Sequence, residues 1–206
     1  MKRESIVYSL AGMFFGVLVG WMLGSQQAGP PAAAPAAPAG STASAPQAAP
    51  TPPPLDVQRA SDLERTANSQ PGDSAVRVEL GNLYFDAERF DLATTWYEAA
   101  LKLDPKNVNA STDLGISYWY QNQADRALEQ FDRSLKIDPN HAKTLLNRGI
   151  VLALGKRDFR GAIDMWNKVI AVGPNTPEAQ QAKQGLDGVY STHPELRPDG
   201  RGGAGG

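Results

Sequence analysis

The chain has 206 residues, a formal net charge of −2 at pH 7 and no cysteine. The absence of cysteine excludes disulfides, thiolate catalysis, cysteine-bound zinc and covalent haem attachment through this chain. Since the charge is close to balanced, there is no basic field for nucleic acid, and we expect no nucleic-acid partner.

Residues 6–24 form an uncharged apolar stretch near the N-terminus. A helix of this length spans roughly 28 Å, which is close to the bilayer core of about 30 Å. Lys2 and Arg3 precede the stretch, and no charge follows it until Asp56. The positive-inside rule therefore places residues 1–5 in the cytoplasm and the rest of the chain outside it. We expect a single-pass anchor in a bacterial inner (cytoplasmic) membrane, with the later domains in the periplasm.

A cleaved signal peptide is the alternative interpretation of this stretch. The apolar core of a signal peptide usually has about 7–15 residues, so 6–24 is long for one. The small-residue positions that could form a cleavage site, 32–34, are flanked by prolines. The length and the flanks favour an uncleaved transmembrane anchor.

Glycines recur on one face of the predicted anchor. Gly12, Gly16, Gly20 and Gly24 are four residues apart and form overlapping GxxxG motifs, which let membrane helices pack closely. The motif indicates a homo-oligomer formed through the anchor. The alternative is composition alone, because glycine is common in membrane helices.

A linker rich in proline and alanine, residues 25–55, follows the anchor. It offers almost nothing to bury, and its prolines favour polyproline II. Fully extended, it would span roughly 90 Å at about 3.1 Å per residue. We expect a semi-rigid spacer rather than a ligand for proline-recognition domains, because no basic residue accompanies the prolines.

The next segment, 56–73, is expected to form a capping helix. Ala60, Leu63 and Ala67 share one helical face within 56–69, and Pro71 lies 34 residues before Pro105. This spacing indicates the second helix of a degraded repeat.

Three units then follow each other at 74–107, 108–141 and 142–176. Equivalent residues recur at intervals of 34 and then 34 or 35, and these sets are Leu80, Leu114 and Arg148; Gly81, Gly115 and Gly149; Tyr84, Tyr118 and Leu152; Ala93, Ala127 and Ala162; Tyr97, Phe131 and Trp166; Pro105, Pro139 and Pro174. One residue is inserted in the third unit, near 155–161.

The central unit, 108–141, shows why each repeat should be a pair of antiparallel helices. Leu114 and Tyr118 share one face of the first helix, and Phe131 lies on the apolar face of the second. Gly115 is small, so the helices can approach closely around the Phe131 ring. A single hairpin cannot bury its apolar faces alone, whereas stacked hairpins can.

The period and these residues resemble the tetratricopeptide repeat family over 74–176. The resemblance implies an all-α solenoid of three helical hairpins, flanked by capping helices, that acts as a scaffold for peptides or proteins. Three positions depart from the family pattern, since Arg148 replaces a leucine and Arg77 and Ser111 replace large apolar residues.

A closing helix is expected at 177–190. Thr176 can accept hydrogen bonds from the free backbone N–H groups, and Pro177 suits the first helical position. The segment lacks the leucine–glycine pair of the repeats. Residues 191–206 end in RGGAGG and are expected to be disordered.

The resemblance also implies a partner-binding groove on the concave side, lined by the first helix of each repeat. Its positions in this chain are Val78, Asn82, Phe85, Asp86, Asn109, Thr112, Asp113, Ile116, Trp119, Tyr120, Lys143, Leu146, Asn147, Ile150 and Leu154. Asparagines could bind a peptide backbone, Tyr120 could anchor it, and Ile116, Leu146 and Ile150 would form an apolar floor. For Trp119 and Phe85, packing against a neighbouring helix is an equal alternative.

One subgroup of the family grips a C-terminal carboxylate with lysine and asparagine side chains. At the matching positions only Asn82 and Lys143 fit, because Val78 is apolar and Asp113 would repel a carboxylate. We therefore expect no binding of that kind.

No catalytic or metal motif is present, so the sequence predicts no enzyme and no cofactor. His141 and His193 have no companion at metal-ligand spacing. Asp86, Glu88 and Asp91 cluster at a helix–helix turn, where a solvated turn is the simpler interpretation than a carboxylate site.

The sequence thus predicts a membrane-anchored scaffold that binds another envelope protein, or a peptide segment of it, in the groove. A narrower alternative is a resemblance to the membrane-tethered tetratricopeptide subunits of cytochrome c maturation, which present apocytochromes for haem attachment. A third is a structural oligomer assembled through the glycine face of the anchor.

Overall fold

The computed structural model describes residues 52–198, and within this range the regular secondary structure is entirely helical. The elements are α2 (Val57–Ser69), α3 (Ser74–Asp86), α4 (Phe90–Leu103), α5 (Val108–Tyr120), α6 (Ala124–Ile137), α7 (Ala142–Lys156), α8 (Phe159–Val172), α9 (Pro177–Thr192) and the 3₁₀ turn η1 (Pro194–Leu196). The predicted all-α class is confirmed for this part of the chain.

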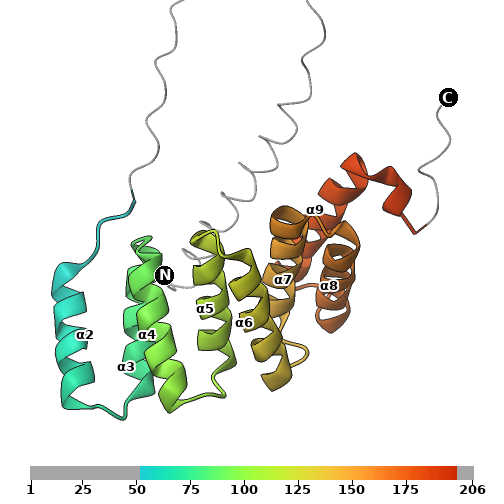
Figure 1. Cartoon of the computed structure of the whole chain (residues 1–206). Coiled ribbons are helices and arrows are strands. Elements are labelled where there is room, and N and C mark those ends of the chain that lie inside the picture. The colour runs from blue at the N-terminus through green and yellow to red at the C-terminus, as the bar shows by residue number, and fades with distance from the viewer. Residues whose placement is uncertain (1–51, 199–206) are drawn as a thin grey trace, which may run out of the picture. The chain divides into compact units, whose positions relative to one another are not determined.

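Three helical hairpins, α3/α4, α5/α6 and α7/α8, stand side by side in chain order between α2 and α9 (Figure 1). The first helices begin at Ser74, Val108 and Ala142, which are the first residues of the three units expected from the period. Each unit of sequence is therefore one hairpin.

Short polar side chains start several of these helices. The Asp73 carboxylate accepts from the backbone N–H groups of Ala75 and Val76, and Asn107 Oδ1 accepts from Ala110 N at 3.0 Å. These contacts satisfy N–H groups that have no partner within the helix. They explain why new first helices begin at Ser74 and Val108, whereas α7 begins after His141 without a side-chain cap.

Each hairpin closes around one aromatic ring and one glycine. A Cβ atom added at Gly115 would lie 2.5 Å from Phe131 Cε1, and one at Gly81 would lie 2.5 Å from Tyr97 Cε1. Phe131 is fully buried. The glycine is required at this position because any side chain would occupy the space of the ring. The third hairpin repeats the arrangement with Trp166.

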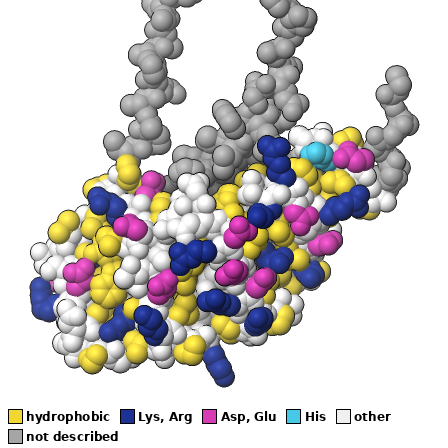
Figure 2. Space-filling model, in the orientation of Figure 1, with side chains coloured by type: hydrophobic (Ala, Val, Ile, Leu, Met, Phe, Trp, Pro, Cys, Tyr) yellow, Lys and Arg dark blue, Asp and Glu magenta, His cyan; other side chains and the backbone are white. Residues whose placement is uncertain are grey.

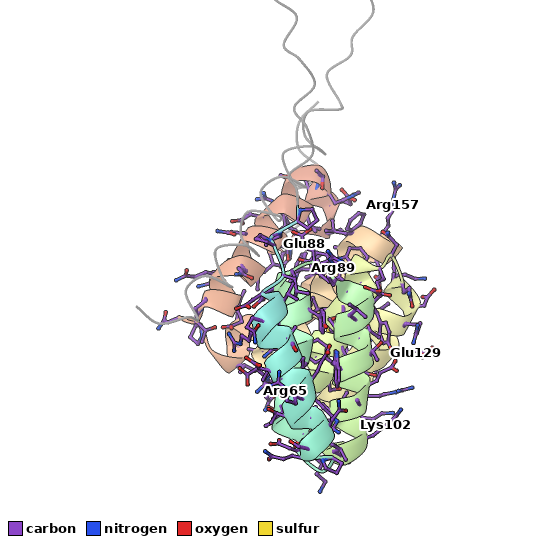
Figure 3. The ribbon with its side chains drawn as sticks, turned by 90° about the vertical axis from the view of Figure 1, so that its left-hand side faces the viewer. Arg65, Glu88, Arg89, Lys102, Glu129 and Arg157 are labelled. Carbon is purple, nitrogen blue, oxygen red and sulfur yellow. The ribbon has the colours of Figure 1, made fainter. Side chains whose placement is uncertain are left out.

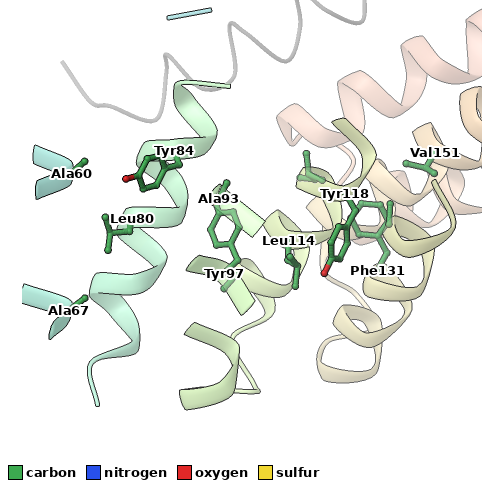
Figure 4. Close-up of a cluster of buried hydrophobic side chains, with 13 residues drawn as sticks. Ala60, Ala67, Leu80, Tyr84, Ala93, Tyr97, Leu114, Tyr118, Phe131 and Val151 are labelled. Atoms are coloured by element: carbon green, nitrogen blue, oxygen red, sulfur yellow. The ribbon is translucent and has the colours of Figure 1, made fainter. Parts of the chain in front are cut away.

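The apolar core runs through the stack in two clusters. Figure 4 shows the first, in which Ala60 and Ala67 of α2 face Leu80 and Tyr84 of α3. The second cluster is centred on Trp166 and joins α7, α8 and α9. The helices at both ends of the stack thus cover apolar surface that the repeats would otherwise expose.

The contacts of α2 match those of the second helices. Tyr84 donates to Glu64 Oε1 at 2.7 Å, and Tyr118 donates to Glu98 Oε1 at 2.5 Å. Both pairs are separated by 20 residues and join a first helix to the second helix before it. This equivalence supports the interpretation of α2 as the second helix of a degraded repeat.

The positions that depart from the family pattern are compensated by polar contacts. Ser111 is buried and hydrogen-bonds to Gln130 Nε2 at 2.7 Å and to Ser134 Oγ at 2.8 Å. Arg148 pairs with Asp132 at 3.0 Å, and Arg77 donates to the carbonyl of Ala67 at the end of α2 and to that of Asp73 before α3. Satisfied polar groups therefore replace apolar packing at these three places.

The turn inside each hairpin places a residue in the left-handed region. These residues are Glu88 (φ 56°), Asn122 (φ 60°) and Arg157 (φ 54°). In Figure 3, Glu88 and Arg157 lie towards one end of the hairpins and Lys102 towards the other.

The C-terminal part is more ordered than expected. Helix α9 continues to Thr192, and η1 follows it, so the prediction of disorder from residue 191 is wrong for 191–198. The reason is packing, since the His193 ring lies 4.3 Å from the Phe159 ring and Leu196 packs against the second core cluster.

Several predictions lie outside the described residues. These are the anchor 6–24 with its four glycines, the linker up to residue 51, and the tail from 199 onward. No helix within 52–198 is long and apolar enough to cross a membrane.

Candidate peptide-binding face

The residues predicted to line the groove come from α3, α5 and α7, and we call the surface they form the first-helix face. Direct contacts join α5 to α7 across it. Lys143 Nζ lies 2.5 Å from Asp113 Oδ1, and His141 Nε2 lies 3.0 Å from Asn109 Oδ1. The repeat period therefore brings residues about 30 positions apart onto one surface.

Not every predicted residue is exposed on this face. Thr112 is fully buried, and its Oγ1 lies 2.6 Å from Thr144 Oγ1 at the α5/α7 interface. Ile116 and Leu146 are buried as well. We correct the predicted set accordingly, because these three side chains pack between helices and leave little surface for a partner.

The remaining predicted residues are polar or partly exposed. Asn82, Asp86 and Asn109 are exposed, whereas Asp113, Lys143, Asn147 and Ile150 are partly buried. Asn82 Oδ1 accepts from the Tyr97 hydroxyl at 2.8 Å, so Asn82 also satisfies a core residue. Asn147 Nδ2 donates to the Lys143 carbonyl at 2.8 Å, within its own helix.

Three aromatic rings meet where α3 ends, α4 begins and α5 ends. The Tyr120 ring stacks on Phe90 with centroids 4.6 Å apart, and it meets Phe85 edge-on at 5.7 Å. Burial raises the pKa of the Tyr120 phenol, and the charge of Glu88 adds to the shift. Tyr120 is 37% exposed, so it is both a packing residue and part of the surface.

Trp119 packs against neighbouring helices. It lies against the first core cluster, and a Cβ atom added at Gly155 would be 2.8 Å from Trp119 Cζ3. For Trp119 the packing alternative is therefore the better description.

The charged side chains of the first-helix face are mostly paired. Arg59 of α2 pairs with Glu79 of α3, and Lys143 pairs with Asp113. Partial burial raises the pKa of the Asp86 carboxyl, Arg59 and Lys143 act to lower it, and Asp113 acts to raise it. On the side shown in Figure 2, charges of both signs are interspersed with apolar side chains.

His141 connects α5 to the start of α7. Its Nδ1 lies 2.7 Å from Thr144 Oγ1, and its Nε2 hydrogen-bonds to Asn109 Oδ1, which requires the Nε2–H tautomer. Burial lowers the pKa of His141. The charges acting on it are those of Asp138, Lys143, Asp113 and Glu178. No cluster of metal-ligating side chains occurs in the part of the chain that the structure describes.

Sequence reasoning missed three residues that shape this face. Phe90 completes the aromatic group, His141 bridges two helices, and Arg59 neutralises Glu79. Each lies outside the first helices, so a rule based on first-helix positions could not find them. Only the 34-residue spacing of neighbouring repeats could have suggested that His141 lies near Asn109.

Family comparisons agree with this architecture. A TPR repeat model matches residues 81–122, and a tetratricopeptide repeat model matches residues 109–141. The residues that these models match, 81–141, are tetratricopeptide repeats. No curated protein matches the chain.

Several solved structures share the fold. MamA has a TM-score of 0.54 at 15% identity, covering 65% of this chain and 88% of MamA. The TPR domain of Arabidopsis OM64 has a TM-score of 0.51 at 21% identity, covering 55% of this chain and 93% of that domain. YrrB, described as a TPR protein with an unusual peptide-binding site, has a TM-score of 0.54 at 25% identity. That match covers 61% of this chain and 64% of YrrB. The resemblance to cytochrome c maturation subunits stays a prediction.

Proposed function

We propose that this tetratricopeptide protein is a membrane-anchored interaction scaffold that binds a peptide segment of another envelope protein on its first-helix face. The observation that carries the proposal is the convergence of three repeats on one surface. Asp86 of α3, Asp113 of α5 and Lys143 of α7 act on one another electrostatically, although they are far apart in sequence. A surface that spans three repeats suits an extended peptide better than a small molecule.

The chemistry of the face supports a peptide ligand. Exposed amides at Asn82 and Asn109 can bond to a peptide backbone, and the rings of Phe85 and Tyr120 provide an apolar anchor point where α3 and α5 end. The peptide-binding description of YrrB is consistent with this class of ligand. A carboxylate-gripping mode is disfavoured, because Lys143 is already neutralised by Asp113.

Site-specific crosslinking tests the binding face. A photoreactive amino acid at position 147, on α7, is compared with the same amino acid at position 167, an exposed asparagine on α8 of the same hairpin. In native membranes, position 147 should crosslink to one protein that mass spectrometry identifies repeatedly, and position 167 should not. Asn147→Arg should then abolish capture of that protein, while Asn167→Arg should leave it unchanged.

Equal crosslinking at both positions, or capture that survives Asn147→Arg, would move the binding site away from the first-helix face. Circular dichroism melting of both variants is the control for folding. Surface substitutions of this kind usually change the free energy of unfolding by no more than about 0.5 kcal/mol.

The membrane part of the proposal rests on residues 1–24, in particular on Lys2 and Arg3 before the apolar stretch. A phosphatase fused after Gly206 should be active, because the enzyme folds only outside the cytoplasm. An inactive phosphatase together with an active cytoplasmic reporter at the same place would reverse the topology. This test is independent of the crosslinking experiment.

A further inference from the structure

Asp86 is the exception to the charge pairing of the first-helix face. Within residues 52–198 its side chain has neither an ion pair nor a hydrogen bond. The cations that act on it are Arg59 and Lys143, and each already contacts another carboxylate, Glu79 or Asp113. The face therefore carries one negative charge that the protein leaves uncompensated.

The position of Asp86 in its helix adds to this negative potential. Asp86 is the last residue of α3, where the helix dipole presents its negative end. The last turn of α3 has no basic side chain that would offset this potential. A carboxylate at this end is disfavoured by the dipole, and a cation is favoured by the carboxylate and the dipole together.

An aromatic group lies at the same end of α3 as this charge. Phe85 precedes Asp86 in the chain, and its ring contacts Phe90 and Tyr120. Lysine and arginine side chains bury an aliphatic stem along apolar surface while the charged head remains at a polar group. The stem can pack against these rings while the head reaches Asp86.

Resting on the function proposed above, we propose that the bound peptide carries a lysine or arginine side chain that pairs with Asp86. The positive charge of that side chain compensates the unpaired carboxylate of Asp86 and the negative end of the α3 dipole. Acidic peptides are disfavoured at the same place, because Asp86 and Glu88 both repel them. The inference therefore specifies the charge of the ligand at one position of the face.

A peptide selection with a double-mutant cycle tests the inference. Phage-displayed random dodecapeptides are selected on the full-length chain in detergent micelles. Only peptides that bind wild type and fail to bind the Asn147→Arg variant are kept. The variants are Asp86→Asn and, as a matched control, Asp164→Asn. Asp164 is an exposed aspartate on α8, so the control removes the same charge away from the first-helix face.

We expect the peptides kept on wild-type protein and on Asp164→Asn to be enriched in lysine or arginine at one position. Changing that residue to methionine should weaken binding to wild type about tenfold, and to Asp86→Asn by less than about twofold. The affinity for wild type should also fall as salt increases. Selection on Asp86→Lys should remove the enrichment.

Two results overturn the inference in distinguishable ways. Peptides that lose binding to Asn147→Arg but show no preference for lysine or arginine, or no coupling to Asp86, would refute the proposed basic side chain. The proposed binding face would still stand. A selection that yields no peptide sensitive to Asn147→Arg would refute the proposed function together with the inference.

Discussion

At the residue scale, the turns inside the hairpins place strain at equivalent positions. Glu88, Asn122 and Arg157 all have positive φ angles, a conformation that costs an L residue about 1–2 kcal/mol. Asparagine tolerates it better than glutamate or arginine, because its short polar side chain can bond locally. The three repeats therefore differ in the strain of their turns.

Glycine at the strained turns should stabilise the protein. We expect Glu88→Gly and Arg157→Gly each to raise the free energy of unfolding by about 0.5–1 kcal/mol, the relief of strain minus the entropy that glycine loses on folding. Asn122→Gly should change it by much less. Urea denaturation of residues 52–198 measures all three, and equal effects at the three turns would contradict this explanation.

The glycines of the helices have two different roles, and replacing each with alanine distinguishes them. Gly115→Ala should destabilise the domain by about 1–3 kcal/mol, because the new Cβ atom overlaps the Phe131 ring. Gly188→Ala on α9 should stabilise it by up to about 1 kcal/mol, because no atom lies within 4 Å of the added methyl group and alanine is the better helix former.

Thermal melting compares the two glycine variants directly. Phe131→Leu added to Gly115→Ala should recover part of the lost stability, since the smaller side chain vacates space near the new methyl group. A Gly115→Ala variant as stable as wild type would mean that the hairpin can widen without cost.

At the element scale, the first helices α5 and α7 are joined by polar contacts. The α5/α7 contact contains Thr112, Thr144 and the His141 ring. Buried polar groups of this kind are costly unless they are satisfied, and no buried side-chain nitrogen or oxygen of residues 52–198 lacks a partner. These contacts set how one hairpin sits on the next.

The contact at His141 should make stability depend on pH. Because burial lowers its pKa in the folded state, the unfolded state binds the proton more tightly, and stability rises with pH. The contribution is present above the unfolded pKa of about 6.5 and is lost as the pH falls below it. Protonation also places a charge in the half-buried contact to Thr144 and Asn109.

Melting at pH 7.5 and pH 5.5 measures the effect. Wild type should lose more stability between these values than His141→Gln, which cannot titrate in this window. Both proteins keep every other titratable group, so the difference between them reports on position 141. The same loss in both would show that other groups determine the pH dependence.

At the scale of the whole molecule, the chain combines an apolar N-terminal stretch, a proline-rich segment and a closed stack of helical hairpins. The stack ends with α2 and α9, which bury the apolar surface of the outer repeats. Further repeats are therefore not needed to cover that surface. The spacing of Gly12, Gly16, Gly20 and Gly24 adds a predicted contact between membrane helices.

Replacing Gly16 and Gly20 with leucine should weaken self-association in a membrane two-hybrid assay by removing the close helix approach. Membrane insertion should be unaffected, because leucine is at least as apolar. The substitution Phe14→Leu, on the opposite face of the predicted helix, provides a control that keeps the glycine face. Unchanged association in the glycine variant would mean that the glycines reflect only the usual composition of membrane helices.

The sequence by itself determined the fold class, the hairpin boundaries and the packing pairs, because a 34-residue period repeats one local structure and Gly115 must face Phe131 wherever that structure forms. Only the tertiary structure decided which first-helix residues are accessible. Thr112 and Asp113 are adjacent in sequence, yet one is fully buried against Thr144 and the other meets Lys143 on the face. Adjacent residues of a helix point in different directions, and which direction α7 covers depends on long-range packing that no local pattern records.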